Sequence, residues 1–310
     1  MKRILFLCLF LPAFALSFGQ QKKICISFDD LPVVSYGITD TLYQKELIFK
    51  LINSLTSKKI PAIGFVNEMK LYEKDSLNHF QIRLIENWVN NNLDLGNHTY
   101  SHPDYNSVTY DEYTRDIMKG GIISSKLLKT HGRELMYFRH PFLHVGNTKS
   151  KADSLEEFLK NNGYTVAPVT VDNEDYLFAL AYKRALAKND IELAKRIGTD
   201  YISYMEEKII YYEQQTIELF GRNICQILLV HASALNSDYI GSLINMLGNR
   251  QYTFVSISEA LKDPAYLTQV SVYGNWGISW IDKWAFSQGK KGDFFRNDPK
   301  TPDYIRELAE

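Results

Sequence analysis

Residues 24–30 read Ile-Cys-Ile-Ser-Phe-Asp-Asp, a short apolar run with strand character that ends directly in two adjacent carboxylates. Runs of this kind recur along the chain, and each is followed by a longer stretch with helical spacing. Strands that alternate with helices predict βαβ units and a parallel sheet. The strand-like runs are Ile24–Phe28, Ala62–Val66, Leu93–Gly96, Leu135–Phe138, Thr165–Val171, Ile224–Val230 and Thr253–Ile257.

Amphipathic stretches separate these runs and predict the helices of the fold. They are Leu42–Leu55, Phe80–Asn91, Tyr110–Lys129, Ser154–Asn161 and Tyr239–Leu247. One interval, at about 178–222, is longer than the others and predicts two more helices. These are Ala179–Lys188 and Ile191–Phe220, the second broken near Gly198.

A length of 310 residues allows either two domains or one elaborated barrel. Seven strand-like runs favour one α/β domain over residues 20–310, a distorted (β/α)7 TIM-like barrel. The interval at about 178–222 is then a helical insertion, and residues from about 270 to 310 form an irregular tail. In that tail Trp276, Trp280 and Trp284 recur every four residues. This spacing favours a packing stripe over a groove-lining face.

The first 19 residues have the pattern of a cleaved signal peptide. Lys2 and Arg3 precede an apolar run over residues 4–16, which is too short to span a bilayer and ends in small residues before Gln20. We therefore expect a secreted or periplasmic protein with no membrane insertion after cleavage. Cys25 and Cys225 then remain in an environment that permits disulfides. Both lie in apolar strand-like runs, which favours buried free thiols over a bridge.

The charge balance argues against a nucleic-acid partner. The chain carries 35 Lys and Arg against 36 Asp and Glu, a formal net charge of −1 at pH 7. Loss of Lys2 and Arg3 with the leader leaves 33 basic against 36 acidic residues, a net charge of −3. No basic run or basic pole is present, so we expect no polyanionic partner.

Five of the seven runs end in an ionisable side chain. These residues are Asp29 with Asp30, His98, Arg139, Asp172 and His231. In a parallel α/β barrel all strand carboxyl ends open on one face, where active sites lie. The pattern predicts that carboxylates, histidines and an arginine from separate strands converge there.

The adjacent residues Asp29 and Asp30 repel each other unless a cation lies between them. The alternative for this pair is an Asx-type turn closed by Pro32. His98 and His102 are four residues apart, a spacing that puts two imidazoles on one face of a helical turn. With one carboxylate they make the three-ligand set of a catalytic zinc site.

Three further motifs supply the remaining chemistry. Arg139, at a strand end, can keep a carboxylate ionised through a bidentate pair. Asp172 to Asp175 form an acidic cluster that either orients a histidine or arginine or is a solvated loop. His231 emerges from an apolar run, where a lone histidine is usually a satisfied core residue, but here it joins a convergent set.

In this order the motifs resemble those of the polysaccharide deacetylase family, the carbohydrate esterases that share the NodB homology domain. Ser27-Phe28-Asp29-Asp30 resembles the family's TFDD motif, and His98–His102 its H[ST]xxH motif. Arg139–Phe142 is similar to RxP[FY], Asp172–Asp175 to DxxDW and Leu229–His231 to LxH. The resemblance runs from about residue 24 to residue 261.

This resemblance implies a NodB-type barrel and a set of roles for these residues. Asp30, His98 and His102 would bind a divalent metal, Zn²⁺ or another such as Co²⁺ or Ni²⁺. The catalytic residues would be Asp29 as general base, His231 as general acid, Arg139 beside Asp29, and Asp175 beside His231. On the substrate side, Phe142 would supply an oxyanion-binding N–H, Leu229 would wall the acetyl methyl pocket, and Tyr176 would stand where the family commonly has a groove-lining Trp.

The implied reaction is hydrolysis of an N- or O-acetyl group on an acetylated carbohydrate. Two alternatives stay open: a hydrolase of a non-sugar amide that uses the same metal site, and a sugar-binding module without activity. The intact ligand and proton-transfer residues argue against the second. Leu31-Pro32 stands where the family usually has glycine, and Tyr176 replaces tryptophan. Both differences from the family's motifs affect the expected choice of substrate more than the expected reaction.

Overall fold

The computed structural model of the protein describes residues 21–310. The predicted signal peptide lies outside the described residues. Among residues 21–310, no helix combines the length and apolar character needed to cross a bilayer.

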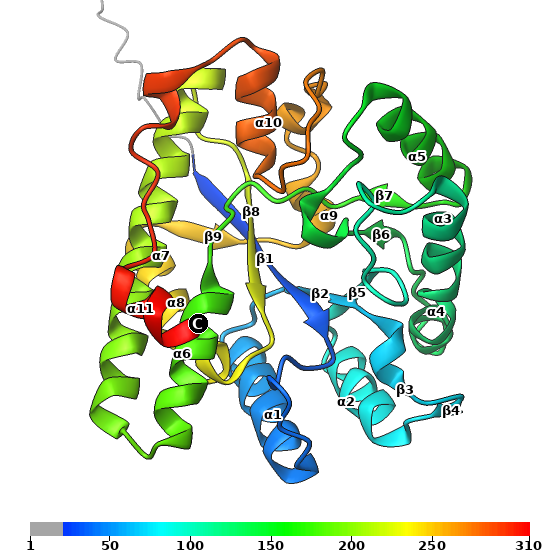
Figure 1. The fold of residues 1–310 in the computed structure, drawn as a ribbon, viewed down its shortest axis with the longest axis vertical. Helices are drawn as coiled ribbons and strands as arrows, with labels where there is room; N and C mark the ends of the chain where they lie inside the picture. Colours follow the sequence, from blue (N-terminus) through cyan, green and yellow to red (C-terminus); the bar gives the residue numbers. More distant parts are fainter. Residues whose placement is uncertain (1–20) are drawn as a thin grey trace, which may run out of the picture.

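A curled sheet of seven parallel strands forms the centre of the molecule (Figure 1). Its order is β7-β6-β5-β2-β1-β8, and β9 pairs with the beginning of β1. The strands are β1 (Lys22–Leu31), β2 (Ile63–Val66), β5 (Asp94–Asn97), β6 (Tyr137–Phe138), β7 (Thr165–Val166), β8 (Gln226–His231) and β9 (Tyr252–Phe254). All seven predicted strands are present and parallel, so the prediction of a distorted α/β barrel is confirmed.

The two edge strands of the sheet, β7 and β8, are joined by the chain that follows β7. Val171 makes a parallel bridge to Leu228 of β8, and the Thr170 N–H donates to the carbonyl of Ile227 at 3.0 Å. The run predicted at 165–171 therefore pairs with β6 at its start and with β8 at its end. It connects the edges through a few hydrogen bonds rather than a full ladder.

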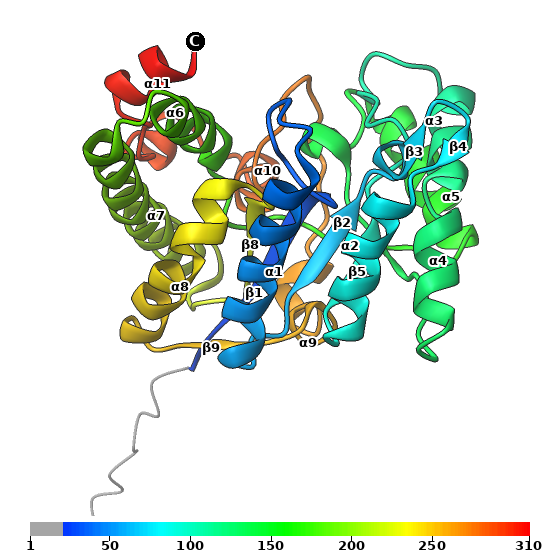
Figure 2. The same cartoon turned by 90° about the horizontal axis from the view of Figure 1, so that it is seen from below.

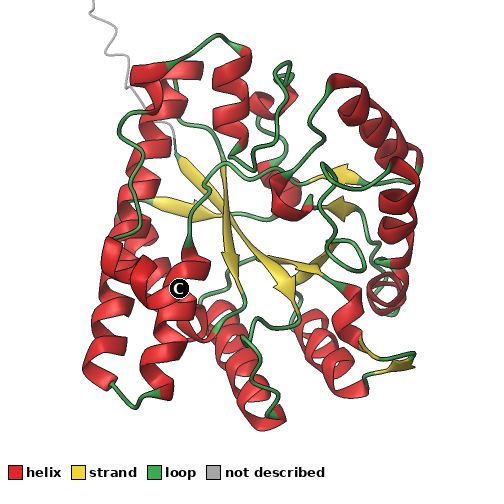
Figure 3. Cartoon of the chain, in the orientation of Figure 1, coloured by secondary structure: helices red, strands yellow, loops and turns green. Residues whose placement is uncertain are grey.

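Helices surround the strands on the outside (Figures 2 and 3). The α-helices are α1 (Thr41–Ser57), α2 (His79–Asn90), α3 (Tyr110–Lys119), α4 (Ile122–Lys129), α5 (Lys149–Asn161), α6 (Asp175–Ala187), α7 (Ile191–Phe220), α8 (Ala234–Asn249), α9 (Ile257–Ala260), α10 (Trp280–Ser287) and α11 (Asp303–Ala309). The short remaining elements are η1 (Glu68–Leu71), β3 (Tyr72–Glu73), β4 (Ser76–Leu77), η2 (Pro141–Leu143), η3 (Pro264–Leu267) and η4 (Gly292–Phe295).

Two helix predictions are corrected at glycines. The stretch 110–129 is two helices, because Gly120 lies against the backbone of Thr99, where an added Cβ would be 2.3 Å from the carbonyl carbon. Conversely, α7 continues without a break through Gly198. There the missing side chain makes room for the ring of Tyr239, which would lie 1.9 Å from a Cβ.

The two faces of β1 pack into different clusters, as the alternation of a strand requires. Ile24, Ile26 and Phe28 pack with the surrounding helices in the main core. Cys25 joins a smaller cluster enclosed by the sheet, together with Cys225 and with Phe65. Both cysteines are buried and free, which confirms that prediction.

The tryptophan stripe is only partly a packing stripe. Trp280 and Trp284 are buried in α10, at 8% and 1% exposure, as expected for packing residues. Trp276 precedes the helix and is 41% exposed, with its ring stacked on Phe286 at 5.4 Å. Because Trp276 is outside the helix, the four-residue spacing does not extend to it.

Candidate active site

Asp29 and Asp30 lie at the carboxyl end of β1, where the pairing with β2 shifts register between Phe28 and Leu31. Asp30 has a φ of +65°, so the chain turns at this point instead of alternating. Both carboxylates therefore reach the same side: Nε2 of His98 lies 3.8 Å from Asp29 Oδ2 and 3.7 Å from Asp30 Oδ1. The expectation that both point into one mouth matches this geometry.

The segment from His98 to His102 is a loop, not the helical turn that its spacing suggested. Thr99 and His102 have φ values of +66° and +58°. The loop is held by Asp116, whose Oδ1 accepts from the N–H groups of Tyr100 and Ser101, both at 2.8 Å. The two imidazole rings still meet, with centroids 4.9 Å apart.

Asp30, His98 and His102 form a group that can hold a metal ion, with ligand atoms all within 4.8 Å of one another. Asp30 Oδ1 lies 3.7 Å from Nε2 of His98 and 3.6 Å from Nε2 of His102. Tetrahedral bonds of ~2.1 Å separate two ligand atoms by roughly 3.4 Å, close to both distances. Asp30 Oδ1 is buried without a hydrogen-bond partner, an arrangement that costs free energy unless a cation is bound.

The protonation of the group suits metal binding. Nδ1 of His98 lies 2.8 Å from the carbonyl oxygen of Arg139 and donates to it, which leaves Nε2 with its lone pair facing Asp30. Burial lowers the pKa of His98 and of His102 to about 4, so both imidazoles are neutral near pH 7. Burial opposes ionisation of Asp30, but Lys70 and the histidines outweigh it and hold the pKa of that carboxyl below its ordinary value.

Arg139 is fully buried and lies next to Asp29. Its Nη1 is 3.3 Å and 3.4 Å from the two carboxylate oxygens of Asp29. The pair expected between Arg139 and a carboxylate is present, but a single nitrogen contacts both oxygens. The other nitrogens bind elsewhere: Nη2 donates to Ser27 Oγ at 3.0 Å and Nε to the Ala167 carbonyl at 2.7 Å. Burial raises the pKa of Asp29, and the charge of Arg139 acts against that rise.

His231 ends β8 directly across from Asp29, its register partner in β1. Nδ1 of His231 lies 2.7 Å from Oδ1 of the fully buried Asp175, at the start of α6. The other oxygen of Asp175 accepts from the His231 N–H and from Asn236 Nδ2, both at 2.8 Å. Burial alone lowers the pKa of His231, but Asp175 outweighs burial and raises it to about 9.

The three residues predicted on the substrate side have different surroundings. Phe142 is 53% exposed, and its ring lies 4.5 Å from that of His102. Leu229 is buried and precedes His231 by two residues, so it lies on the same face of β8. Tyr176 is 47% exposed and its carbonyl accepts from the hydroxyl of Tyr36 at 3.0 Å.

Four supporting residues were not predicted from the sequence motifs, because each contacts the site from a position in the chain outside those motifs. Asp116 and Asn236 act as described above, and Asn67 donates to the His98 carbonyl at 2.7 Å. Lys70 donates to the Asp30 carbonyl at 2.7 Å. Ser27, which accepts from Arg139, is a fifth supporting residue and did carry a sequence signal, since it lies two residues before Asp29 and so on the same face of β1.

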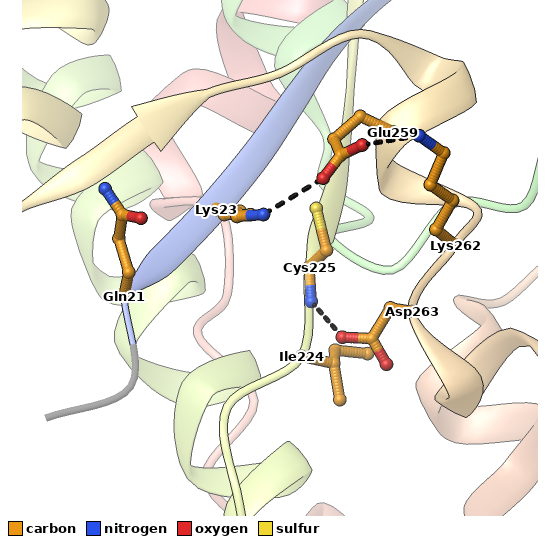
Figure 4. Close-up of a pocket in the computed structure, with 7 residues that line it drawn as sticks. All are labelled: Gln21, Lys23, Ile224, Cys225, Glu259, Lys262 and Asp263. Atoms are coloured by element: carbon orange, nitrogen blue, oxygen red, sulfur yellow. Dashed lines mark hydrogen bonds and ion pairs between the residues drawn. The ribbon is translucent and has the colours of Figure 1, made fainter. Parts of the chain in front are cut away.

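A cavity of about 320 Å³ lies at the opposite, amino-terminal end of the strands (Figure 4). Its charged groups are already paired: Lys23 with Glu259 at 3.0 Å, and Lys262 with Glu259 at 2.9 Å. Asp263 accepts from the Cys225 N–H at 2.9 Å. This end of the barrel contains none of the predicted site residues.

The sequence profile of the polysaccharide deacetylase family matches residues 19–167. The match includes the motifs at Asp29, His98 and Arg139. The resemblance is thereby confirmed, and residues 19–167 belong to the polysaccharide deacetylase family. The motifs at Asp175 and His231 lie beyond the matched segment, and it is the fold that brings them to the same mouth. No curated protein matches the sequence.

Solved structures of peptidoglycan deacetylases are similar in fold. The Bc1960 peptidoglycan N-acetylglucosamine deacetylase is 19% identical, with a TM-score of 0.50 over 78% of this chain and 88% of that one. A mutant of the peptidoglycan deacetylase PdaC from Bacillus subtilis is 17% identical, with a TM-score of 0.50 over 78% and 91%. BA3943 from Bacillus anthracis, a CE4 family pseudoenzyme, is 13% identical, with a TM-score of 0.46 over 78% and 66%. At these low identities, the two structures with a TM-score of 0.50 show similarity of fold alone.

Proposed function

We propose that the protein is a metal-dependent hydrolase that removes N- or O-acetyl groups from a carbohydrate. The observation that carries this proposal is the buried, unpartnered Oδ1 of Asp30 between the Nε2 atoms of His98 and His102. Two further groups with acid–base chemistry, Asp29 and His231, lie opposite each other on adjacent strands at the same mouth.

Asp30, His98 and His102 would hold one divalent metal, Zn²⁺ or another such as Co²⁺ or Ni²⁺. Such an ion, when bound, polarises an acetyl carbonyl and lowers the pKa of a water molecule from ~15.7 toward ~7. The carbonyl of Arg139 keeps His98 in the tautomer that presents Nε2 to the ion.

Asp29 is the proposed general base and accepts a proton from the attacking water. Its side chain is 4% exposed, so bulk water does not compete for it, and it lies 3.8 Å from His98. Burial raises its pKa, which brings the carboxylate closer to the strength that proton abstraction requires. Arg139 holds the carboxylate in place and offsets part of the cost of its buried charge.

His231 is the proposed general acid, which gives its proton to the departing amine or alcohol. A pKa of about 9 keeps it protonated near neutral pH, and Asp175 holds the ring by Nδ1 so that Nε2 is the donating atom. The N–H of Phe142 would donate to the oxyanion, and Leu229 would contact the acetyl methyl group. Tyr176 is half-exposed and directly follows Asp175 in the sequence, and it would contact a sugar unit of the substrate.

The carbohydrate substrate is proposed from the family match, and the net charge of −3 after loss of the leader suits a neutral glycan better than a polyanion. The leader pattern of residues 1–19 supports a secreted or periplasmic location, where such glycans are found.

An acetate-release assay over acetylated glycans and small acyl amides, with and without a chelator, tests the proposal. We expect chelator-sensitive acetate release from the glycans, restored by added Zn²⁺ or Co²⁺. Release from small amides alone would instead indicate the alternative hydrolase of a non-sugar amide. Sugar binding without release from any substrate would indicate a binding module and would overturn the proposal.

A further inference from the structure

Residues 275–283 of the C-terminal tail lie directly against residues 140–144, which we call the Phe142 turn. At Gly277 an added Cβ would lie 1.9 Å from the carbonyl oxygen of Phe142 and 3.3 Å from Cδ2 of His144. Only a glycine allows the tail backbone to approach the turn this closely. The orange tail segment is visible beside the green chain that follows β6 (Figure 1).

Lys283, in α10, ties the same two segments together. Its Nζ donates to the carbonyl of Leu143 at 3.2 Å and to the carbonyl of Ile278 at 2.6 Å. The residue is 3% exposed, so water does not replace these bonds easily. Charge-assisted bonds of this kind are roughly twice as strong as neutral ones. Lys283 therefore joins the Phe142 turn to the tail through a single buried ammonium group.

The Phe142 turn has a backbone conformation that depends on such support. Phe142 and Leu143 both have φ of +55°, an unfavourable region for non-glycine residues. Conformations of this kind persist where the surroundings hold them, and they cluster at functional sites. On its other side the turn is held by His144, whose Nδ1 lies 2.6 Å from Asp104 Oδ1. The tail and Asp104 thus brace the turn from two directions.

We propose that Gly277 and Lys283 are positioning residues, which hold the Phe142 turn so that its N–H points at the reacting carbonyl. This inference rests on the proposed deacetylation. The ring of Phe142 lies 4.5 Å from that of the metal-ligand candidate His102, so a shift of the turn changes the site itself. Misplacement of a catalytic group by ~1 Å can cost ~10²-fold in rate. Both residues lie beyond the segment 19–167 that matches the family.

The test uses Gly277→Ala and Lys283→Met in the full-length protein. Either variant should lower kcat by about 10- to 100-fold with KM and zinc affinity unchanged, because the lost interaction is made only in the transition state. Hydrogen exchange of the amides in residues 140–144 should become faster. Since both variants act through one turn, the double variant should cost less than the product of the two single effects.

Matched controls are Gly241→Ala, where an added Cβ meets nothing within 4 Å, and Lys262→Met, an exposed lysine at the other end of the barrel. Both should leave kcat and amide exchange unchanged. If Gly277→Ala does not fold, Lys283→Met decides the question alone. Unchanged kcat in a folded, metal-binding variant would overturn the inference, and so would an effect confined to KM. A wild-type protein that releases no acetate would instead refute the proposed function, a separate result.

Discussion

Nδ1 of His98 donates to the carbonyl oxygen of Arg139 at 2.8 Å, while the guanidinium of the same arginine lies 3.3 Å from Asp29. One residue therefore orients a metal-ligand candidate through its backbone and steadies the candidate base through its side chain. The two carboxylates at the end of β1 have different environments as a result. Asp29 has an arginine partner, whereas Asp30 Oδ1 has none.

Replacement of Arg139 tests how far the fold depends on this arrangement. Arg139→Met leaves the buried carboxylate of Asp29 without a partner, which typically costs about 3–5 kcal/mol of stability. Urea unfolding measures the loss. The double variant Arg139→Met/Asp29→Asn should recover part of it, because no buried charge is then left unpaired. Equal stability of the single and double variants would show that the pair is not energetically coupled. Arg115→Met, at an exposed helix position, is the control.

Asp29→Asn separates proton transfer from metal binding. The variant keeps the size of the side chain but cannot accept the proton, so kcat should fall by about 10²- to 10⁴-fold. Zinc affinity, measured by calorimetry, should stay close to that of the wild type because Asp30 and the two histidines are intact. Asp153→Asn, an exposed carboxylate paired with Lys149, is the matched control. Unchanged acetate release with metal bound would mean that Asp29 is not the base.

The strands and most helices were predictable because each has a local signature. Apolar runs such as 24–28 and 224–230 are buried on both faces, and parallel strands covered by helices need no alternation of polar residues. The convergence of Asp29, His98, Arg139 and His231 followed from one topological rule, that parallel strands share a carboxyl-end face.

The local conformation of the site was not predictable in the same way. Asp30, Thr99, His102 and Phe142 all have positive φ without being glycine. No sequence signal marks such residues, since distant groups hold them, as Asp116 holds the loop at Tyr100 and Ser101. The prediction of a helical turn at His98–His102 was wrong for this reason. The helix break predicted at Gly198 was also wrong. The glycine makes room for the ring of Tyr239, which is 41 residues away in the chain.

Metal binding should stabilise the protein through Asp30, His98 and His102. A ligand at 100 times its Kd adds about 2.7 kcal/mol to the free energy of unfolding, so Zn²⁺ should raise Tm in the wild type. His102→Ala removes one of three ligands and should lose most of this rise. His79→Ala, an exposed histidine, should keep it. A full zinc-dependent rise in His102→Ala would place the ion elsewhere.

Asp175→Asn should lower the pKa of His231. In the wild type Asp175 outweighs burial and raises that pKa to about 9, above the ordinary value of 6.5. A raised pKa means that the ion pair stabilises the fold in full below pH ~6.5, by about 3 kcal/mol, and that this contribution is lost as the pH rises toward 9. In the variant burial is opposed only by the charges of Asp29 and Asp30, so the pKa of His231 should fall and less of the residue should be protonated and able to act as an acid near pH 7. NMR titration of the metal-free protein measures the pKa directly.

The pH profile of the zinc-loaded enzyme gives the functional counterpart of that titration. Because His231 must be protonated to release the leaving group, activity should fall on the alkaline side as it loses its proton. Asp175→Asn should move this alkaline limb to lower pH, whereas Asp153→Asn, an exposed carboxylate paired with Lys149, should leave it in place. A limb that stays fixed in Asp175→Asn, while NMR shows the lowered pKa, would mean that a group other than His231 is the acid.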